Sequence, residues 1–173
     1  MVPEPRDAHD LPHIGWREWV ALPELGVPHI KAKIDTGART SALHAFDIEI
    51  LLRGRRRIVR FKVHPFQRDG RATVEAEAEL VDERRIRSST GHVTVRPVIE
   101  TEVEILGERH AIELTLVGRD EMGFRMLIGR EAMRKRFLVD PGRSYLGGRP
   151  AAVRKKKKKK KKTKREPRRE RRS

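Results

Sequence analysis

The feature that most restricts the fold of this chain is a succession of short strand-like stretches separated by turns. Apolar and polar residues alternate in several of them, as in Val93-Thr94-Val95-Arg96, and this period of two is typical of a half-buried strand. Glycine-containing turns such as Arg53-Gly54 separate the stretches. We expect strands over 16–22, 29–34, 48–52, 58–63, 73–80, 93–99, 101–105 and 112–117, and one short helix over 131–136. The pattern predicts a mainly β domain, either a sandwich or a barrel.

The positive charge of the chain is concentrated at one end. The whole sequence has 173 residues, 41 Lys and Arg, 25 Asp and Glu, and a formal net charge of +16. Residues 151–173 hold 15 of the basic and 2 of the acidic residues, so the rest of the chain is nearly neutral. We therefore expect a flexible N-terminus over 1–13, a folded domain over 14–147 and a disordered Lys/Arg-rich tail over 148–173.

Composition excludes several classes of protein. The chain has no cysteine, so disulfides and thiol or Cys-zinc chemistry are ruled out. No apolar run approaches the roughly 20 residues of a membrane-spanning helix, and the first residues lack the apolar segment of a signal peptide. We expect a soluble cytoplasmic protein with no membrane partner.

The segment with the clearest chemical content is Lys33-Ile34-Asp35-Thr36-Gly37. A predicted strand ends at Ile34 and runs directly into Asp-Thr-Gly, where glycine permits a sharp turn and threonine supplies a hydroxyl. Such a turn would hold the carboxylate of Asp35 rigidly at the end of the strand. The alternative is an ordinary turn, because all three residue types favour turns.

A second segment, Met126-Leu127-Ile128-Gly129-Arg130, lies far later in the chain. Aspartic proteases of the retroviral type pair an Asp-Thr-Gly loop with a later apolar-apolar-Gly strand and a short helix. Here both parts occur in that order, and the apolar strand would pack beneath the loop. The alternative is a buried strand followed by a helix cap.

Over about residues 14–146 the chain resembles the bacterial retropepsin-like, or RimB-like, family, which also carries the label ATP-dependent zinc protease. The matching motifs, in chain order, are 33–45 (Lys-Ile-Asp-Thr-Gly-Ala-Arg-Thr-Ser-Ala-Leu-His-Ala), 88–91, 96–101, 114–116 with Arg119 and Met122, 127–130, and 137–140. The basic tail lies outside the resemblance.

The resemblance implies a retropepsin-like closed β-barrel, the acid protease fold, with one short C-terminal helix. It implies that Asp35 is catalytic and that Thr36 and Gly37 shape its loop. The polar turn 88–92 would be the flap that closes over substrate, or else a plain surface hairpin. The expected substrate-binding residues are Arg39, Ser89, Thr90, Gly91, Gly129 and Arg130.

The resemblance also implies a homodimer, because the chain contains no second Asp-Thr-Gly or Asp-Ser-Gly. Two copies of Asp35 would meet on a two-fold axis and share one proton, since two adjacent carboxylates cannot both ionise cheaply. The ionised carboxylate would act as general base on a water and the protonated one would polarise the peptide carbonyl.

We expect no metal site and no cofactor, despite the family's label. None of the seven histidines forms a His-Glu-x-x-His motif, and His44, near the Asp loop, is the best of a weak set of zinc ligands. No Gly-x-x-x-x-Gly-Lys-Ser/Thr loop is present to bind the phosphates of ATP.

Two functions remain open from the sequence. The first is a dimeric aspartic endopeptidase; because related genes accompany a ligase that adds glutamates to a ribosomal protein, the resemblance implies a glutamate-rich peptide substrate. The arginines that begin the segment 53–82 would line a groove for such a peptide, or simply face water. The alternative is a non-catalytic binding module tethered to RNA or the ribosome by residues 151–173 through phosphate attraction.

Overall fold

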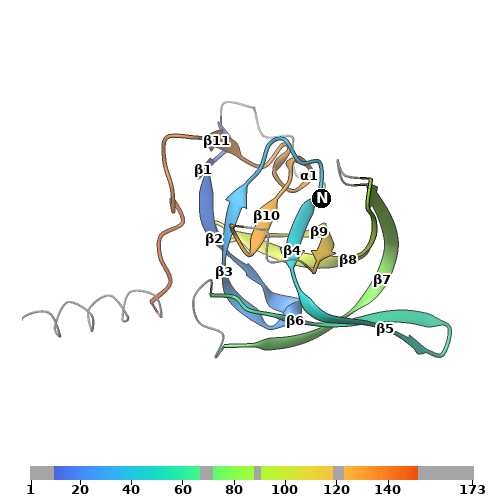
Figure 1. Cartoon of the computed structure of the whole chain (residues 1–173). Coiled ribbons are helices and arrows are strands. Elements are labelled where there is room, and N and C mark those ends of the chain that lie inside the picture. Colours follow the sequence, from blue (N-terminus) through green and yellow to red (C-terminus); the bar gives the residue numbers. More distant parts are fainter. Residues whose placement is uncertain (1–9, 67–71, 88–90, 119–122, 152–173) are drawn as a thin grey trace, which may run out of the picture.

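The fold is known from a computed structural model that describes residues 10–66, 72–87, 91–118 and 123–151 (Figure 1). The strands in chain order are β1 (His13–Gly15), β2 (Arg17–Leu22), β3 (Val27–Ile34), β4 (Ser41–His44), β5 (Phe46–Arg53), β6 (Arg56–Val63), β7 (Val74–Arg87), β8 (Val93–Ile105), β9 (Glu108–Val117), β10 (Met126–Ile128) and β11 (Leu138–Asp140). The helical elements are a 3-10 turn, η2 (Pro23–Leu25), and one short helix, α1 (Arg130–Met133).

The main sheet closes on itself. Its strands follow the order β2-β3-β10-β4-β9-β8, and a bridge between Ala21 of β2 and Glu104 of β8 joins the two ends. Closure removes the free edges that an open sheet would expose. The predicted mainly β, retropepsin-like closed barrel with one short helix is therefore confirmed.

The strands β7, β6 and β5 extend the sheet beyond the barrel on the β8 side. The hairpin of β5 and β6 turns at Gly54, which has a φ of 63°, and projects away from the barrel (Figure 1). The long strands β7 and β8 pair from Leu80 and Ile99 to Arg87 and Val93. Residues 88–90, between these two strands, lie outside the described part of the chain.

The interior is mostly aliphatic, because alternate residues of each strand point inward. Strand β2 shows this pattern without interruption, with Glu18, Val20 and Leu22 buried between half-buried neighbours. The largest fully buried apolar side chains are Ile14, Leu22, Ile30, Leu43, Phe61, Ile99, Ile105, Leu114, Leu116, Met126 and Ile128. Among the largest fully buried side chains, Glu18 is the one that is charged, and it has no exposed surface.

The carboxylate of Glu18 fastens the end of the folded domain to its beginning. Its Oε1 accepts hydrogen bonds from the backbone N–H groups of Gly15 at 2.9 Å and Leu146 at 2.8 Å, and its Oε2 accepts one from Gly147 at 3.3 Å. Three donors compensate the loss of water around a buried carboxylate. The C-terminal segment therefore lies against β2, and the parallel pair β1 and β11 lies nearby.

The structure describes parts of the predicted N-terminus, domain and tail. Residues 1–9 and 152–173 lie outside the described ranges, so the flexible N-terminus and the disordered tail stay predictions. Strand β1 begins at His13, at the predicted edge of the domain. In the ranges that are described, no helix is long and apolar enough to cross a membrane.

Candidate active site

The Asp-Thr-Gly loop follows strand β3 directly. The N–H of Asp35 donates to the carbonyl oxygen of Ile128 at 2.9 Å, which anchors the start of the loop to β10. The Oδ1 atom of Asp35 accepts hydrogen bonds from the N–H groups of Gly37 at 3.0 Å and Ala38 at 3.3 Å. These bonds fix the orientation of the carboxylate. Asp35 is half-buried, whereas Thr36 and Gly37 are exposed, so the loop lies at the surface of the chain.

Strand β10 supports this loop from below, as the sequence predicted. It pairs in parallel with β3, where Ile128 lies opposite Ile34, and antiparallel with β4. The N–H of Gly129 donates to Oγ of Ser41 at 3.1 Å. A Cβ atom on Gly129 would lie 2.5 Å from the backbone carbonyl of Thr40, so only glycine fits at this contact.

The start of α1 is also joined to the loop. The N–H of Arg130 donates to the carbonyl oxygen of Ala38 at 2.9 Å, and the N–H of Glu131 donates to that of Arg39 at 3.1 Å. The Arg130 side chain donates from Nη1 to the carbonyl oxygens of Thr36 at 2.8 Å and Gly37 at 3.0 Å. The backbone at the start of α1 and the side chain of Arg130 therefore both hold the loop.

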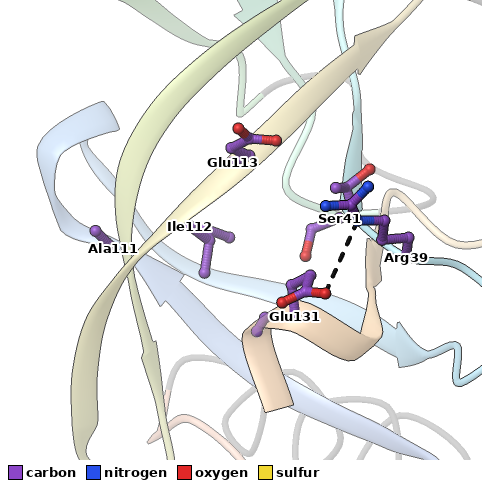
Figure 2. A pocket seen from close by; sticks show the side chains of 8 residues that line it. Arg39, Ser41, Ala111, Ile112, Glu113 and Glu131 are labelled. Carbon is purple, nitrogen blue, oxygen red and sulfur yellow. Dashed lines mark ion pairs between the residues drawn. The ribbon is translucent and has the colours of Figure 1, made fainter. Parts of the chain in front are cut away.

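A polar pocket of about 230 Å³ adjoins the loop, between α1, β4 and β9 (Figure 2). Figure 2 shows Arg39 and Glu131 facing one another across it, with 3.8 Å between Arg39 Nε and Glu131 Oε1. Asp35 does not line this pocket. The pocket therefore flanks the carboxylate and does not contain it. Its lining residues are Arg39, Thr40, Ser41, Ala111, Ile112, Glu113, Glu131 and Ala132.

Arg84 of β7 connects the long hairpin to this region, and sequence reasoning missed it. Its Nη1 donates to Oγ1 of Thr40 at 3.0 Å, and its Nη2 forms a very short ion pair with Glu113 of β9. Its Nε also lies 3.5 Å from a carboxylate oxygen of Asp82. No local pattern marks this arginine among the many in the sequence, because its partners come from other strands.

The predicted site residues fall into two groups, those around the Asp35 loop and those of the predicted flap. The first surrounds the Asp35 loop and comprises Asp35, Thr36, Gly37, Arg39, Gly129 and Arg130. Of the predicted flap, Ser89 and Thr90 lie outside the described residues, and Gly91 precedes β8 with a φ of 83°. Gly129 is buried against the loop backbone.

The histidine proposed as the best zinc ligand, His44, has a structural partner. His44 is buried, and its Nδ1 lies 3.1 Å from Nη1 of Arg125. Among the residues that the structure describes, no three His, Asp or Glu side chains lie close enough together to hold a metal ion. The arrangement at the loop is thus one fixed carboxylate at the protein surface with basic side chains beside it.

A closed barrel that presents an Asp-Thr-Gly loop above an Ile-Gly strand end has the architecture of retropepsin-like proteins. Residues 13–150 match the family model of the retropepsin-like aspartic endopeptidase RimB. The chain belongs to this RimB-like family.

Curated relatives include proteins of Shewanella halifaxensis and Desulfotalea psychrophila, each named a probable alpha-L-glutamate ligase. The first is 45% identical over 78% of this chain and the second 46% over 74%. The chain spans only 30% and 28% of their respective lengths. It is therefore similar to one part of these longer proteins.

A crystal structure of a Legionella pneumophila protein of unknown function has a similar fold, with a TM-score of 0.65. The similarity covers 79% of this chain and 98% of the Legionella chain at 23% sequence identity. This likeness supports the fold alone.

Proposed function

We propose that this protein is an aspartic endopeptidase that acts as a homodimer, with one Asp-Thr-Gly loop from each subunit. The observation that carries the proposal is the Asp35 carboxylate, which is held by the N–H groups of Gly37 and Ala38 at the surface of the chain. Membership of the RimB-like family supports the same assignment.

The dimer follows from the need for a second carboxylate. The sequence contains one Asp-Thr-Gly, so a single chain supplies half of an aspartic-protease site. Thr36 and Gly37 are exposed, which leaves this side of the loop accessible to a second copy. A two-fold axis beside the loop would place one Asp35 against the other.

In the proposed mechanism the two Asp35 carboxyl groups hold one proton between them. The ionised carboxylate takes a proton from water, whose oxygen forms a bond to the peptide carbon while the protonated partner donates to the carbonyl oxygen. Collapse of the tetrahedral intermediate returns a proton to the pair, transfers one to the leaving nitrogen and breaks the C–N bond. The hydrogen bonds from Gly37 and Ala38 keep the carboxylate oriented throughout.

The proposed substrate is a glutamate-rich peptide. The relatives named probable alpha-L-glutamate ligases carry a segment about as long as this domain within a longer chain, which associates the domain with glutamate polymers. Exposed basic side chains on both sides of the loop, Lys33 and Arg39, favour an acidic ligand electrostatically. Arg39 and Arg130 are the proposed substrate contacts among the described residues, and Gly129 contributes by supporting the loop.

The test is hydrolysis of a peptide that ends in a run of glutamates, followed by mass spectrometry. The wild-type protein should shorten this peptide, and a glutamine-ended peptide of equal length should be cleaved more slowly. Asp35→Asn should abolish cleavage and leave the sedimentation coefficient of the dimer unchanged. Asp10→Asn, at an exposed position, serves as the matched control. Cleavage by the Asp35 variant would refute the proposed role of this residue.

A further inference from the structure

Half-buried aromatic side chains gather on the outside of the barrel, over β2 and the C-terminal segment. The rings of Trp19 and Tyr145 lie 6.4 Å apart and nearly parallel, with 29° between their planes. Phe66 lies 6.4 Å from Trp19 on another side. The buried core does not include the rings of Trp19, Tyr145 or Phe66.

Cationic groups alternate with these rings. The guanidinium carbon of Arg17 lies 4.4 Å from the ring centre of Trp16 and 5.0 Å from that of Tyr145. The guanidinium carbon of Arg149 also lies 5.0 Å from Tyr145. Contacts of this kind are favourable for the ring and the cation. Arg149 is exposed and forms no ion pair among the described residues, so its charge remains available to a ligand.

A groove of about 430 Å³ runs beside this cluster. Trp19 and Ala21 of β2 line it, together with His29 of β3 and the C-terminal residues Arg149 and Pro150. Its one acidic lining residue, Glu104, is neutralised by Arg109 at 2.6 Å. The groove therefore offers the ring of Trp19 and the charge of Arg149. Tyr145 does not line the groove but contacts both of these side chains.

Hydrogen bonds also hold the C-terminal segment in place beside the aromatic cluster. The N–H of Tyr145 donates to the carbonyl oxygen of Arg17, and the N–H of Trp16 to that of Arg143, both at 2.9 Å. Glu18 adds further hydrogen bonds to the same segment. The segment is therefore fastened by hydrogen bonds as well as by its ring contacts.

The groove also lies where the chain continues into its most basic part. Arg149 and Pro150 line the groove, and the sequence then runs through Arg154 into the unbroken lysines of 155–162. A polyanion attracted by these lysines would reach the groove at the same time. Rings, guanidinium groups and a neighbouring polycation are the combination that binds single-stranded nucleic acid, whose unpaired bases can stack.

We propose that the groove beside Trp19, Tyr145 and Arg149 binds single-stranded RNA. Bases stack on Trp19 and on the Arg149 guanidinium, which Tyr145 supports, and a phosphate pairs with Arg149. A duplex is excluded because its bases are already stacked. This binding is independent of the proposed peptidase activity, since Asp35 does not line the groove.

Intrinsic fluorescence provides a direct test, because Trp19, one of the two tryptophans of the chain, lines the groove. A uridine oligomer of about 12 nucleotides, near the site size of known single-strand binders, should quench the fluorescence of the full chain. Inorganic polyphosphate of similar charge should bind the lysines without quenching. Equal quenching by both ligands would overturn the proposal.

Variants separate stacking from charge. Tyr145→Leu removes the ring that supports Trp19 and Arg149 and should weaken binding of the uridine oligomer by about 5- to 100-fold, as expected for one lost base stack. Tyr145→Phe keeps this ring and should bind like the wild type. Arg149→Ser should weaken binding and reduce the salt dependence by about one phosphate contact. Arg55→Ser, at an exposed position on the distant β5–β6 hairpin, should change it less.

Three results would contradict the proposal. Wild-type affinity of the Tyr145→Leu and Arg149→Ser variants for the uridine oligomer would assign all binding to the tail. A double-stranded RNA that binds as tightly as the single strand would exclude base stacking. An oligoglutamate peptide that quenches the tryptophans more strongly than RNA would assign the groove to acidic peptides instead.

Discussion

The side chain of Arg130 donates a hydrogen bond to the backbone carbonyl oxygen of Thr36, 94 positions earlier in the chain, over a distance of 2.8 Å. A second bond from the same nitrogen reaches the carbonyl of Gly37 at 3.0 Å. The first residue of α1 thus holds the two loop residues that follow Asp35. Because Asp35 is itself bonded to the N–H of Gly37, Arg130 acts on the carboxylate through the loop.

Arg130→Met should therefore reduce peptide hydrolysis with little loss of stability. A misplacement of about 1 Å at a reacting group lowers the rate by roughly 100-fold, so we expect kcat to fall by about 10- to 100-fold. KM should rise as well, because Arg130 is also a proposed substrate contact. Steady-state kinetics with the glutamate-ended peptide provide the measurement. Arg134→Met, directly after α1, where Arg134 pairs with Glu131, is the control and should retain kcat.

Gly129→Ala should disrupt the support beneath the loop. The added Cβ would lie 2.5 Å from the backbone of Thr40, a contact that forces β10 and the loop apart. We expect a loss of about 2–4 kcal/mol in the free energy of unfolding, typical of overpacking at a rigid site. Gly123→Ala, where no atom lies within 4 Å of the added carbon, should unfold like the wild type. Equal urea midpoints for both variants would contradict the predicted contact.

Glu18→Gln should loosen the C-terminal segment. The buried carboxylate accepts hydrogen bonds from Gly15, Leu146 and Gly147, and an amide nitrogen in place of one oxygen would face these N–H groups. We expect a destabilisation of about 2–4 kcal/mol and faster amide hydrogen exchange at Leu146. Glu100→Gln, an exposed change on β8, should alter stability by less than about 0.5 kcal/mol. Unchanged exchange at Leu146 would argue against the role of Glu18.

His110 should make the fold less stable in mildly acidic solution. Burial lowers the pKa of His110 below its ordinary value of 6.5, and the charge of Arg136 lowers it further. Its Nε2 donates to the carbonyl of Ala132 at 2.8 Å, and its buried Nδ1 has no partner for a second proton. The folded state then binds fewer protons than the unfolded chain, so stability is complete above 6.5 and falls as the pH drops towards the lowered pKa.

The measurement is the free energy of unfolding of wild type and His110→Gln at a series of pH values. The variant should lose this part of the pH dependence below about 6.5 and show a constant difference from wild type above about 7.5, where the imidazole is neutral in both states. Identical slopes for the two proteins in the acidic range would contradict the lowered pKa.

The positions of most strands could be predicted because their period of two is local. The predicted breaks were less reliable. The stretches 93–99 and 101–105 form one strand, β8, which passes through the exposed Glu100 without interruption. A shift of register in β7 between Leu80 and Asp82, opposite Ile99 and Val98, alters the alternation there. No pattern in one strand reveals a bulge in its neighbour.

Short strands were missed for a related reason. Strand β4 has four residues and follows the Asp loop, so its alternation is too brief to recognise. It is a strand because β9 and β10 pair with it on its two sides. Pairing with strands from elsewhere in the chain therefore makes β4 a strand, although its own residues show no clear strand preference.

The residues of the candidate site also differ in whether a local sequence pattern could predict them. The Asp-Thr-Gly loop and the Ile-Gly support are contiguous motifs and could be found in the sequence. Arg84 could not, because its bond to Thr40 spans 44 positions and depends on the path of the β7–β8 hairpin. Glu18 was missed because a glutamate in a strand ordinarily faces water, and only the closed barrel reveals that this one is buried.

The central claim is that two Asp35 side chains from different subunits form one catalytic pair, and a mixing experiment tests it most directly. Wild-type protein is equilibrated with an equal amount of Asp35→Asn and assayed on the glutamate-ended peptide, with Asp10→Asn as the control partner. If only dimers with two intact Asp35 residues cleave, the mixture should keep about half the activity of its wild-type protein alone, because subunits pair at random. Undiminished wild-type activity in the presence of excess Asp35→Asn that forms mixed dimers would contradict the account.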